Sequence, residues 1–244
     1  MFRIAALTDM GVGRKNNQDG FYIDGIFSVE DCFRMEYYET TNDEILVAVT
    51  DGVGGTENGE FAVRKCFEYF RKTDINYDNI PDVINHLNVY ITEEAKRAGK
   101  DTATTIAGIL ISSSKVYSFN VGDSRVYSIN NGYLEKISKD DTATEMLKES
   151  DIIPGNEIIE KAPLLQSLGG KLQNIDCHYK KIEYGQGYLL CTDGLTDALT
   201  IDTIEDTLEK YKGNIKEQVK TLVELAKKAS VTDNITVIIV SAEE

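Results

Sequence analysis

Blocks of strand-like sequence separated by pairs of helix-like segments predict an α+β fold built on antiparallel sheets. Runs of apolar and β-branched residues, typical of strands, lie at residues 2–8, 21–50, 104–137, 176–192 and 235–240. Pairs of segments with helical periodicity lie between them, at residues 62–70 with 80–91 and at 201–208 with 215–226. Several strands in a row, interrupted by helix pairs, favour antiparallel sheets whose outer faces the helices cover.

The first half of the chain opens with strands. Residues 2–8 form the first, and residues 21–49 contain two or three more around a polar turn at 40–43, with the weakest pattern at 33–37. The apolar, β-branched run from Ile45 to Thr50 is typical of a buried strand. In the two helices that follow, one face is apolar, so both must pack on an apolar surface.

The second half repeats this order. Residues 104–111 are apolar on both faces and predict a central strand, and Asn131-Gly132 predicts a hairpin between strands at 125–129 and 133–137. Residues 138–170 have a weaker pattern, with a short helix at 142–148, and predict a long irregular insertion. Two strands, a helix pair and a last strand complete the chain, at residues 176–182, 188–192, 201–208, 215–226 and 235–240.

The charge of the chain argues against nucleic acid and anionic membrane surfaces as partners. Its 244 residues carry 26 Lys and Arg against 41 Asp and Glu, a formal charge of −15. Nucleic acids and anionic lipids are bound by an excess of basic side chains. The four cysteines have no Cys-x-x-Cys spacing, and neither a signal peptide nor an apolar run of membrane-spanning length is visible. We therefore expect a cytoplasmic protein.

Only two histidines are present, His86 and His178, and we interpret both as ordinary surface or core residues. A histidine-rich zinc site or a Ser-His-Asp triad is thereby disfavoured. Catalytic chemistry must then use oxygen ligands, which suit hard cations such as magnesium and manganese.

Acids flank the strand-like runs at five positions: Asp19, Asp51, Asp123, Asp193 and Asp233. Asp51 and Asp193 both occur in the sequence Thr-Asp-Gly. A single Asp-Gly is a common turn, but five acids in similar positions predict one carboxylate-lined metal site. The glycines after Asp51 permit a tight turn and a close approach to the backbone.

The polar loop at residues 9–20 adds a basic residue to these acids. It lacks the third glycine of a dinucleotide-binding fingerprint, but it places Arg14 five residues before Asp19. Arginine binds phosphate through its planar guanidinium group. Taken alone, Arg14 would be an exposed loop arginine. Beside a carboxylate site it is a candidate for phosphate binding.

Together these motifs resemble the metal-dependent protein serine/threonine phosphatases of type 2C, especially their small bacterial single-domain members. The family's opening motif, Asp-x-Gly-x-x-Arg-x-x-Asn-Glu-Asp, is matched by residues 9–19, and Asp-Gly-x-Gly-Gly by residues 51–55. Further matches follow in the family's order at residues 103–105, 122–125, 193–195 and 233–234. The resemblance implies a four-layer αββα sandwich, in which two antiparallel β-sheets are flanked by helix pairs. It also implies a single domain of residues 1–244 with a flap at about 138–168.

The resemblance assigns roles within the site. Its implied metal ligands are Asp19, Asp51, Gly52, Asp123, Asp193 and Asp233. Asp51 would bridge two ions, Mn²⁺ or Mg²⁺, which would activate a water for in-line attack on phosphorus. Asp123 would belong to a third, weaker ion site. Arg14 and Asp51 are the implied catalytic residues, with Arg14 holding the phosphate.

The sequence departs from the family pattern at three places. Gln18 stands where the family has Glu, so one metal is expected to bind less tightly. Val53 replaces a histidine proposed as general acid in many eukaryotic relatives. The flap has Asp140-Asp141-Thr142 in place of Asp-His-Ser.

Three functions are compatible with these features. The leading hypothesis is hydrolysis of phosphoserine and phosphothreonine in proteins, in kinase-linked signalling. The expected partners are phosphorylated proteins, including a serine/threonine protein kinase, and the chain is expected to be a monomer. The first alternative is a catalytically silent phosphatase-like binding module, supported by Gln18 and Val53. The second, a carboxylate-pair glycosidase, would use aromatic sugar platforms, and the chain has no Trp.

Overall fold

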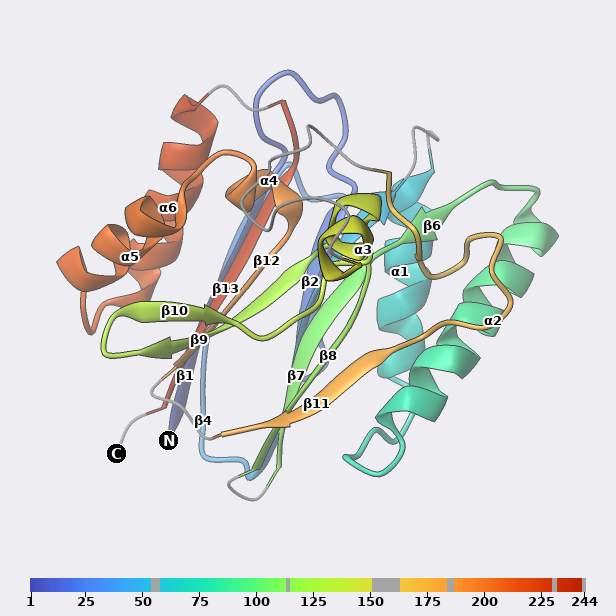
Figure 1. Cartoon of the computed structure of the whole chain (residues 1–244), viewed down its shortest axis with the longest axis horizontal. Helices are drawn as coiled ribbons and strands as arrows, with labels where there is room; N and C mark the ends of the chain where they lie inside the picture. The colour runs from blue at the N-terminus through green and yellow to red at the C-terminus, as the bar shows by residue number, and fades with distance from the viewer. Residues whose placement is uncertain (54–57, 113–114, 151–162, 184–186, 230–231, 243–244) are drawn as a thin grey trace.

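Two antiparallel sheets stack at the centre of the molecule, and helices cover both outer faces (Figure 1). This computed structural model describes residues 1–53, 58–112, 115–150, 163–183, 187–229 and 232–242. The strand order of the first sheet is β10 (Tyr133–Lys136), β9 (Arg125–Asn130), β12 (Gly187–Cys191), β13 (Ile235–Ala242), β1 (Phe2–Asp9) and β4 (Phe33–Thr40).

The second sheet carries the strand around which the site is built. Its order is β11 (His178–Ile182), β8 (Lys115–Val121), β7 (Ile106–Ser112), β5 (Glu44–Val53), β2 (Asp19–Ile23) and β3 (Ile26–Val29). The short strand β6 (Ala103–Thr104) pairs with the end of β5. The helices are α1 (Gly59–Phe70), α2 (Ile80–Ala98), α3 (Ala143–Glu149), α4 (Asp193–Thr196), α5 (Ile201–Lys210) and α6 (Ile215–Lys228).

Three apolar layers hold the four structural layers together. The middle layer lies between the sheets and contains residues such as Phe21, Val47 and Ile238. The outer layers lie between the second sheet and α1 with α2, and between the first sheet and α5 with α6. Because successive strand residues face opposite sides, a strand covered on both faces must be apolar throughout. β12 shows this, since Leu190 joins the middle layer and Leu189 an outer one.

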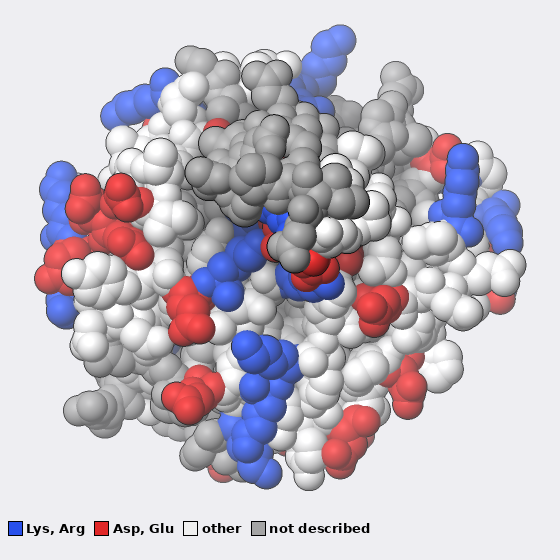
Figure 2. Space-filling view, in the orientation of Figure 1, with Lys and Arg blue, Asp and Glu red and all other residues white. Residues whose placement is uncertain are grey.

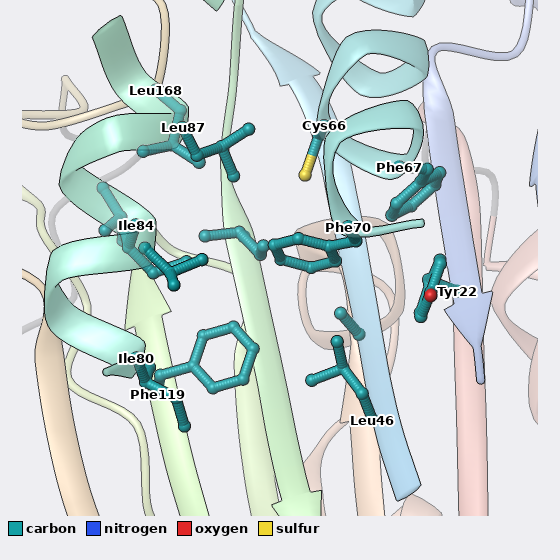
Figure 3. Packing of buried hydrophobic residues seen from close by; sticks show 14 of the residues in the cluster. Tyr22, Leu46, Cys66, Phe67, Phe70, Ile80, Ile84, Leu87, Phe119 and Leu168 are labelled. Atoms are coloured by element: carbon teal, nitrogen blue, oxygen red, sulfur yellow. The ribbon is translucent and has the colours of Figure 1, made fainter. Parts of the chain in front are cut away.

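Figure 3 shows the outer layer under α1 and α2. Phe67 and Phe70 of α1 and Ile84 of α2 lie between the helices and the sheet, in one cluster with Tyr22 and Phe119 of the sheet. Phe67, Ile84 and Phe119 are buried almost completely. Burial of one such side chain contributes roughly 1.5–3 kcal/mol, so the helical apolar faces explain why this helix pair stays on the sheet.

The predicted αββα sandwich of two antiparallel sheets flanked by helix pairs is confirmed. The predicted hairpin is also present, with Asn131 and Gly132 at φ 53° and 86° between β9 and β10. The weak segment at 33–37 forms β4 at the edge of the first sheet. An edge strand has only one paired neighbour, which accounts for its weak pattern.

Several boundaries differ from the sequence expectation. β5 does not end at its acid but continues to Val53, because Gly52 pairs with Thr104. The expected strand at 104–111 is split at Thr105, and β11 begins at His178. The predicted flap lies partly outside the described residues, and so do Gly54 and Gly55. Within the described chain, no helix is both long and apolar enough to cross a membrane.

Candidate metal and phosphate site

Asp19 and Asp51 lie side by side at one end of the sandwich. β2 begins at Asp19, β5 passes through Asp51, and the two residues are direct partners in the antiparallel register. Burial raises the pKa of Asp19 to about 8, against a hydrogen bond from Thr192 and with repulsion from Asp193 and Asp233. These effects make the protonated form the stable one near neutral pH when no cation is present.

The pKa of Asp51 is also raised well above its ordinary value. Burial is the largest cause, and repulsion from Asp19, Asp193, Asp123 and Asp233 follows. The carboxylate of Asp51 therefore interacts with all the other predicted carboxylate ligands. Buried like charges held together by the fold are the setting that a bound divalent cation would stabilise.

Asp193 and Asp233 come from neighbouring strands of the first sheet. Asp193 opens the short helix α4 directly after β12, and Asp233 precedes β13. The backbone N–H of Thr192 donates to the carbonyl of Thr236 at 3.1 Å, which holds the two segments together. A Cβ at Gly194 would lie 2.0 Å from the Asn234 carbonyl oxygen, so the residue after Asp193 has to be glycine.

Asp123 lies on the turn between β8 and β9. Gly122 before it has φ +100°, and a Cβ there would meet the Thr105 side chain at 2.7 Å. Ser124 after it shares a 2.7 Å hydrogen bond with the Thr105 hydroxyl. Thr105 also binds the backbone of Asp51, accepting from its N–H at 3.0 Å. Burial raises the pKa of Asp123 to about 6, and Asp140 adds to this by repulsion.

A buried polar network supports Asp19 from the first sheet. The Thr192 hydroxyl donates to Asp19 Oδ2 at 2.7 Å, and Asn17 Oδ1 accepts from the Asp19 N–H at 3.2 Å. Asn17 Nδ2 donates to the Thr8 hydroxyl, which lies 2.8 Å from that of Thr236. Fixing a carboxylate by several hydrogen bonds limits its movement, which a metal ligand requires.

The loop that carries Arg14 is fastened by Asn234. The side-chain oxygen of Asn234 accepts from the Gln18 N–H at 2.9 Å, and its Nδ2 donates to the carbonyls of Met10 and Asn16. Gly11, at φ +74°, approaches so closely that a Cβ would lie 1.8 Å from the Asp233 carbonyl oxygen. The sequence motifs contain these residues, but sequence reasoning missed the role of Asn234 as the centre of the loop.

Arg14 lies beside one of the acids. Its Nη2 donates to Asp233 Oδ1 at 2.6 Å and its Nε to the Thr232 carbonyl at 2.9 Å. The side chain is 44% exposed, so the guanidinium is accessible from outside. A guanidinium has five N–H donors, and these two contacts leave Nη1 for another acceptor.

Gln18 and Gly52 meet at the start of α1. The Gly52 N–H donates to the Gln18 carbonyl at 3.0 Å, and Gly52 packs directly on Gly59, where a Cβ would lie 2.7 Å from the Gly59 Cα. The side-chain amide of Gln18 donates to Glu60 Oε2 at 3.3 Å. Glu60 thus places a carboxylate next to Gln18, the position at which the family pattern has Glu. Sequence reasoning did not consider Glu60.

The acids do not form a preassembled coordination shell. Among the residues that the structure describes, no group of three or more His, Cys, Asp or Glu side chains is arranged so that it could hold an ion. Arg14 contacts Asp233, and Thr192 contacts Asp19. The donors are nevertheless all oxygens, and burial raises the pKa values of Asp19, Asp51 and Asp123, which fits a site for hard divalent cations.

The buried acids differ from the acidic surface of the molecule. On the face shown in Figure 2, Asp and Glu side chains are interspersed with Lys and Arg. Charges at such exposed positions are screened by water and salt. The formal charge of −15 counts exposed and buried acids together, but Asp19 and its neighbours form a separate, buried group.

A family profile matches most of the chain, and several relatives match nearly all of it. The profile described as protein phosphatase 2C matches residues 28–230. The chain belongs to the protein phosphatase 2C family. It is 27% identical to the serine/threonine protein phosphatase PstP of Mycobacterium tuberculosis, over 98% of this chain, and spans only 45% of the length of that relative. It is 28% identical to a serine/threonine phosphatase of Listeria welshimeri, covering 96% of this chain and 93% of the relative.

Solved structures of the family agree with the fold. The serine/threonine phosphatase Stp1 from Staphylococcus aureus superimposes with a TM-score of 0.82 at 26% identity, covering 98% of this chain and 95% of that one. The catalytic domain of PstP, in complex with two manganese ions, superimposes with a TM-score of 0.76 at 25% identity and covers both chains completely.

Proposed function

We propose that this chain is a metal-dependent phosphatase that removes phosphate from phosphoserine and phosphothreonine in proteins. Membership of the family and similarity to named serine/threonine phosphatases support this. The observation that carries the proposal is the position of Asp51, whose pKa is raised by burial and by every other predicted carboxylate ligand.

The cations proposed for this site are two Mn²⁺ or Mg²⁺ ions, with a third at Asp123. The structure of PstP with two manganese ions supports the choice of metal. Asp51 with the Gly52 carbonyl, together with Asp19, Asp193 and Asp233, would hold the ion pair. When bound, such ions supply the Lewis acidity that activates a water for attack on phosphorus.

The remaining chemistry would come from the side chains. Arg14, held by the Thr232 carbonyl and Asp233, has its Nη1 donor available for a phosphoryl oxygen and would balance charge that develops there. The buried network around Asn17 and Thr192 would keep Asp19 in one orientation. No protein nucleophile is required, because water attacks directly in this scheme.

Phosphorylated proteins, including a serine/threonine protein kinase, are the proposed substrates, and we propose a cytoplasmic monomer. The proposed substrates rest on membership of the family, and the location and the monomeric state are the expectations drawn from the sequence. The silent binding module is the competing hypothesis, because Gln18 and Val53 depart from the family pattern, but similarity to relatives named as serine/threonine phosphatases favours the enzyme.

Hydrolysis of a phosphothreonine peptide with Mn²⁺, with Mg²⁺ and with EDTA tests the proposal. We expect turnover that needs the metal and that disappears in Asp193→Ala. Asp206→Ala is the matched control, since Asp206 is exposed on α5, away from the site. Circular dichroism establishes that both variants fold. Folded wild type without turnover at any metal concentration would favour the silent module.

A further inference from the structure

Asp141 joins three separate segments near the site. We use "flap base" for residues 138–142 and 163–168, the described segments at the two ends of the predicted flap. Asp141 lies in the first of these segments and is buried, with its side chain 7% exposed. Sequence reasoning noted it only as a departure from the Asp-His-Ser pattern.

One set of contacts connects Asp141 to the turn that carries Asp123. The Gly122 N–H donates to Asp141 Oδ2 at 2.8 Å, and the Asp141 N–H donates to the Gly122 carbonyl at 3.0 Å. Gly122 directly precedes Asp123. Two hydrogen bonds between the same two residues fix both the distance and the direction of the turn.

A second set connects Asp141 to the other end of the flap base and to β11. Its Oδ1 lies 2.6 Å from His178 Nε2 and accepts from Gln166 Nε2 at 3.0 Å. The Asp141 carbonyl accepts from the Leu165 N–H at 2.7 Å. His178 is thus not an ordinary surface residue, since it meets a buried carboxylate.

The chemistry of these contacts requires a carboxylate. Asp141 accepts from three side-chain or backbone donors through two oxygens, whereas an asparagine has one oxygen and adds two donors. Hydrogen bonds to an ionised group are stronger than neutral ones, and leaving a buried donor unpaired is unfavourable. Replacement of Asp141 by Asn would therefore disturb Gly122, Gln166 or His178.

We propose that Asp141 and His178 are positioning residues that hold the Asp123 turn for binding of the weaker divalent ion. The proposal rests on the proposed function, because it gives Asp123 a metal to bind. Asp141 acts on Asp123 through Gly122, and His178 acts by orienting the Asp141 carboxylate. Neither residue is expected to touch the substrate.

Amide hydrogen exchange tests the structural part without any activity. In Asp141→Asn, exchange at the Gly122 amide should become about tenfold faster or more, the effect expected from losing one charge-assisted hydrogen bond. His178→Ala should give a smaller increase, and His178→Gln should restore protection, because a glutamine amide can donate from a similar position. His86→Ala, which replaces the other histidine, is the matched control and should change nothing. Unchanged exchange at Gly122 in Asp141→Asn would overturn the proposal.

Titration with Mn²⁺ tests the link to metal binding, with the unbound ion measured by its electron paramagnetic resonance signal. We expect Asp141→Asn to weaken the weakest class of bound Mn²⁺ about tenfold and to leave the tighter ions unchanged. With phosphopeptide, the Mn²⁺ concentration at half-maximal rate should rise by a similar factor, with kcat at saturating Mn²⁺ within about twofold.

The outcomes separate the two proposals. If Gly122 exchange and Mn²⁺ binding respond while wild type never hydrolyses the peptide, the positioning role stands and the phosphatase function fails. If wild type is active and Mn²⁺ binding is the same in Asp141→Asn and wild type, the positioning role fails.

Discussion

The acids at the end of the sandwich fall into two regions that are built differently. Asp19 and Asp51 lie opposite each other on adjacent strands in the middle of the second sheet. Asp123 lies on a turn that is held by side chains, through Thr105 on one side and Asp141 on the other. Burial raises the pKa of Asp19 to about 8 but that of Asp123 only to about 6.

This difference shows how the fold can position two kinds of proposed ligand, one by strand pairing and one by side-chain hydrogen bonds. The spacing of Asp19 and Asp51 follows from backbone register, which cannot change without moving a whole strand. The position of Asp123 depends on a few hydrogen bonds that single substitutions can alter. We therefore expect the first region to set whether the site works and the second to adjust how much metal it needs.

The largest expected effect comes from Asp51. Asp51→Asn keeps the shape of the side chain but removes the charge that would bridge two ions, so kcat should fall by a factor of about 1,000 or more. Peptide hydrolysis at saturating Mn²⁺ measures this, with Asp206→Ala as the control. A loss of less than about tenfold would mean that the strand pair is not the principal ligand region.

The second-largest expected effect is on how the free energy of unfolding depends on pH, which should differ between the two regions. Folding raises the pKa of Asp19 from 3.8 to about 8, so the folded state binds this proton more tightly than the unfolded state. This contribution favours folding at low pH and is lost as the pH rises through about 8. In EDTA, the free energy of unfolding of wild type should therefore fall by on the order of 5 kcal/mol between about pH 4 and pH 8, relative to that of Asp19→Asn.

Urea unfolding at several pH values measures that difference, and Mn²⁺ should reduce it by stabilising the anionic form. If the free energy of unfolding depended on pH equally in wild type and Asp19→Asn in EDTA, the assignment of a raised pKa to Asp19 would be contradicted. The same comparison with Asp123→Asn should give a smaller total difference, confined to the range below about pH 6, because the pKa of Asp123 is raised less.

Asp123→Asn should have an intermediate effect on activity. The Mn²⁺ concentration at half-maximal rate should rise about tenfold, while the rate at saturating Mn²⁺ falls less than in Asp51→Asn. Rates measured over a series of Mn²⁺ concentrations test this. An Asp123→Asn variant as inactive as Asp51→Asn at every concentration would remove the distinction between the two regions.

The smallest effect is expected at Gln18. Gln18→Glu replaces the amide that donates to Glu60 and places two carboxylates together, so the metal-free protein should lose about 1 kcal/mol of stability. Calorimetry in EDTA and in Mn²⁺ measures the change. A variant that melts at a higher temperature than wild type in EDTA would show that the contact with Glu60 does not matter.

Much of the fold could be predicted because it depends on local patterns. The helical apolar faces and the Asn131-Gly132 turn are determined by neighbouring residues in the chain, and all were found in the expected places. The acids next to strands could be recognised for the same reason. Their association at one site was inferred from similarity of position and from the family motifs.

The supporting contacts could not be predicted because they join distant segments. Asn234 binds residues more than 200 positions earlier, and His178 meets Asp141 across 37 positions. A single sequence contains no record of which Asn or His finds a buried partner. The extension of β5 past Asp51 had a similar cause, since it depends on pairing with β6.

Titration of the metal-free protein with Mn²⁺ tests the central claim most directly. Wild type and Asp206→Ala should each bind two tight ions, and Asp51→Asn should bind neither tightly while remaining folded by circular dichroism. Equal Mn²⁺ binding by Asp51→Asn and wild type would contradict the assignment of the strand pair as the metal site.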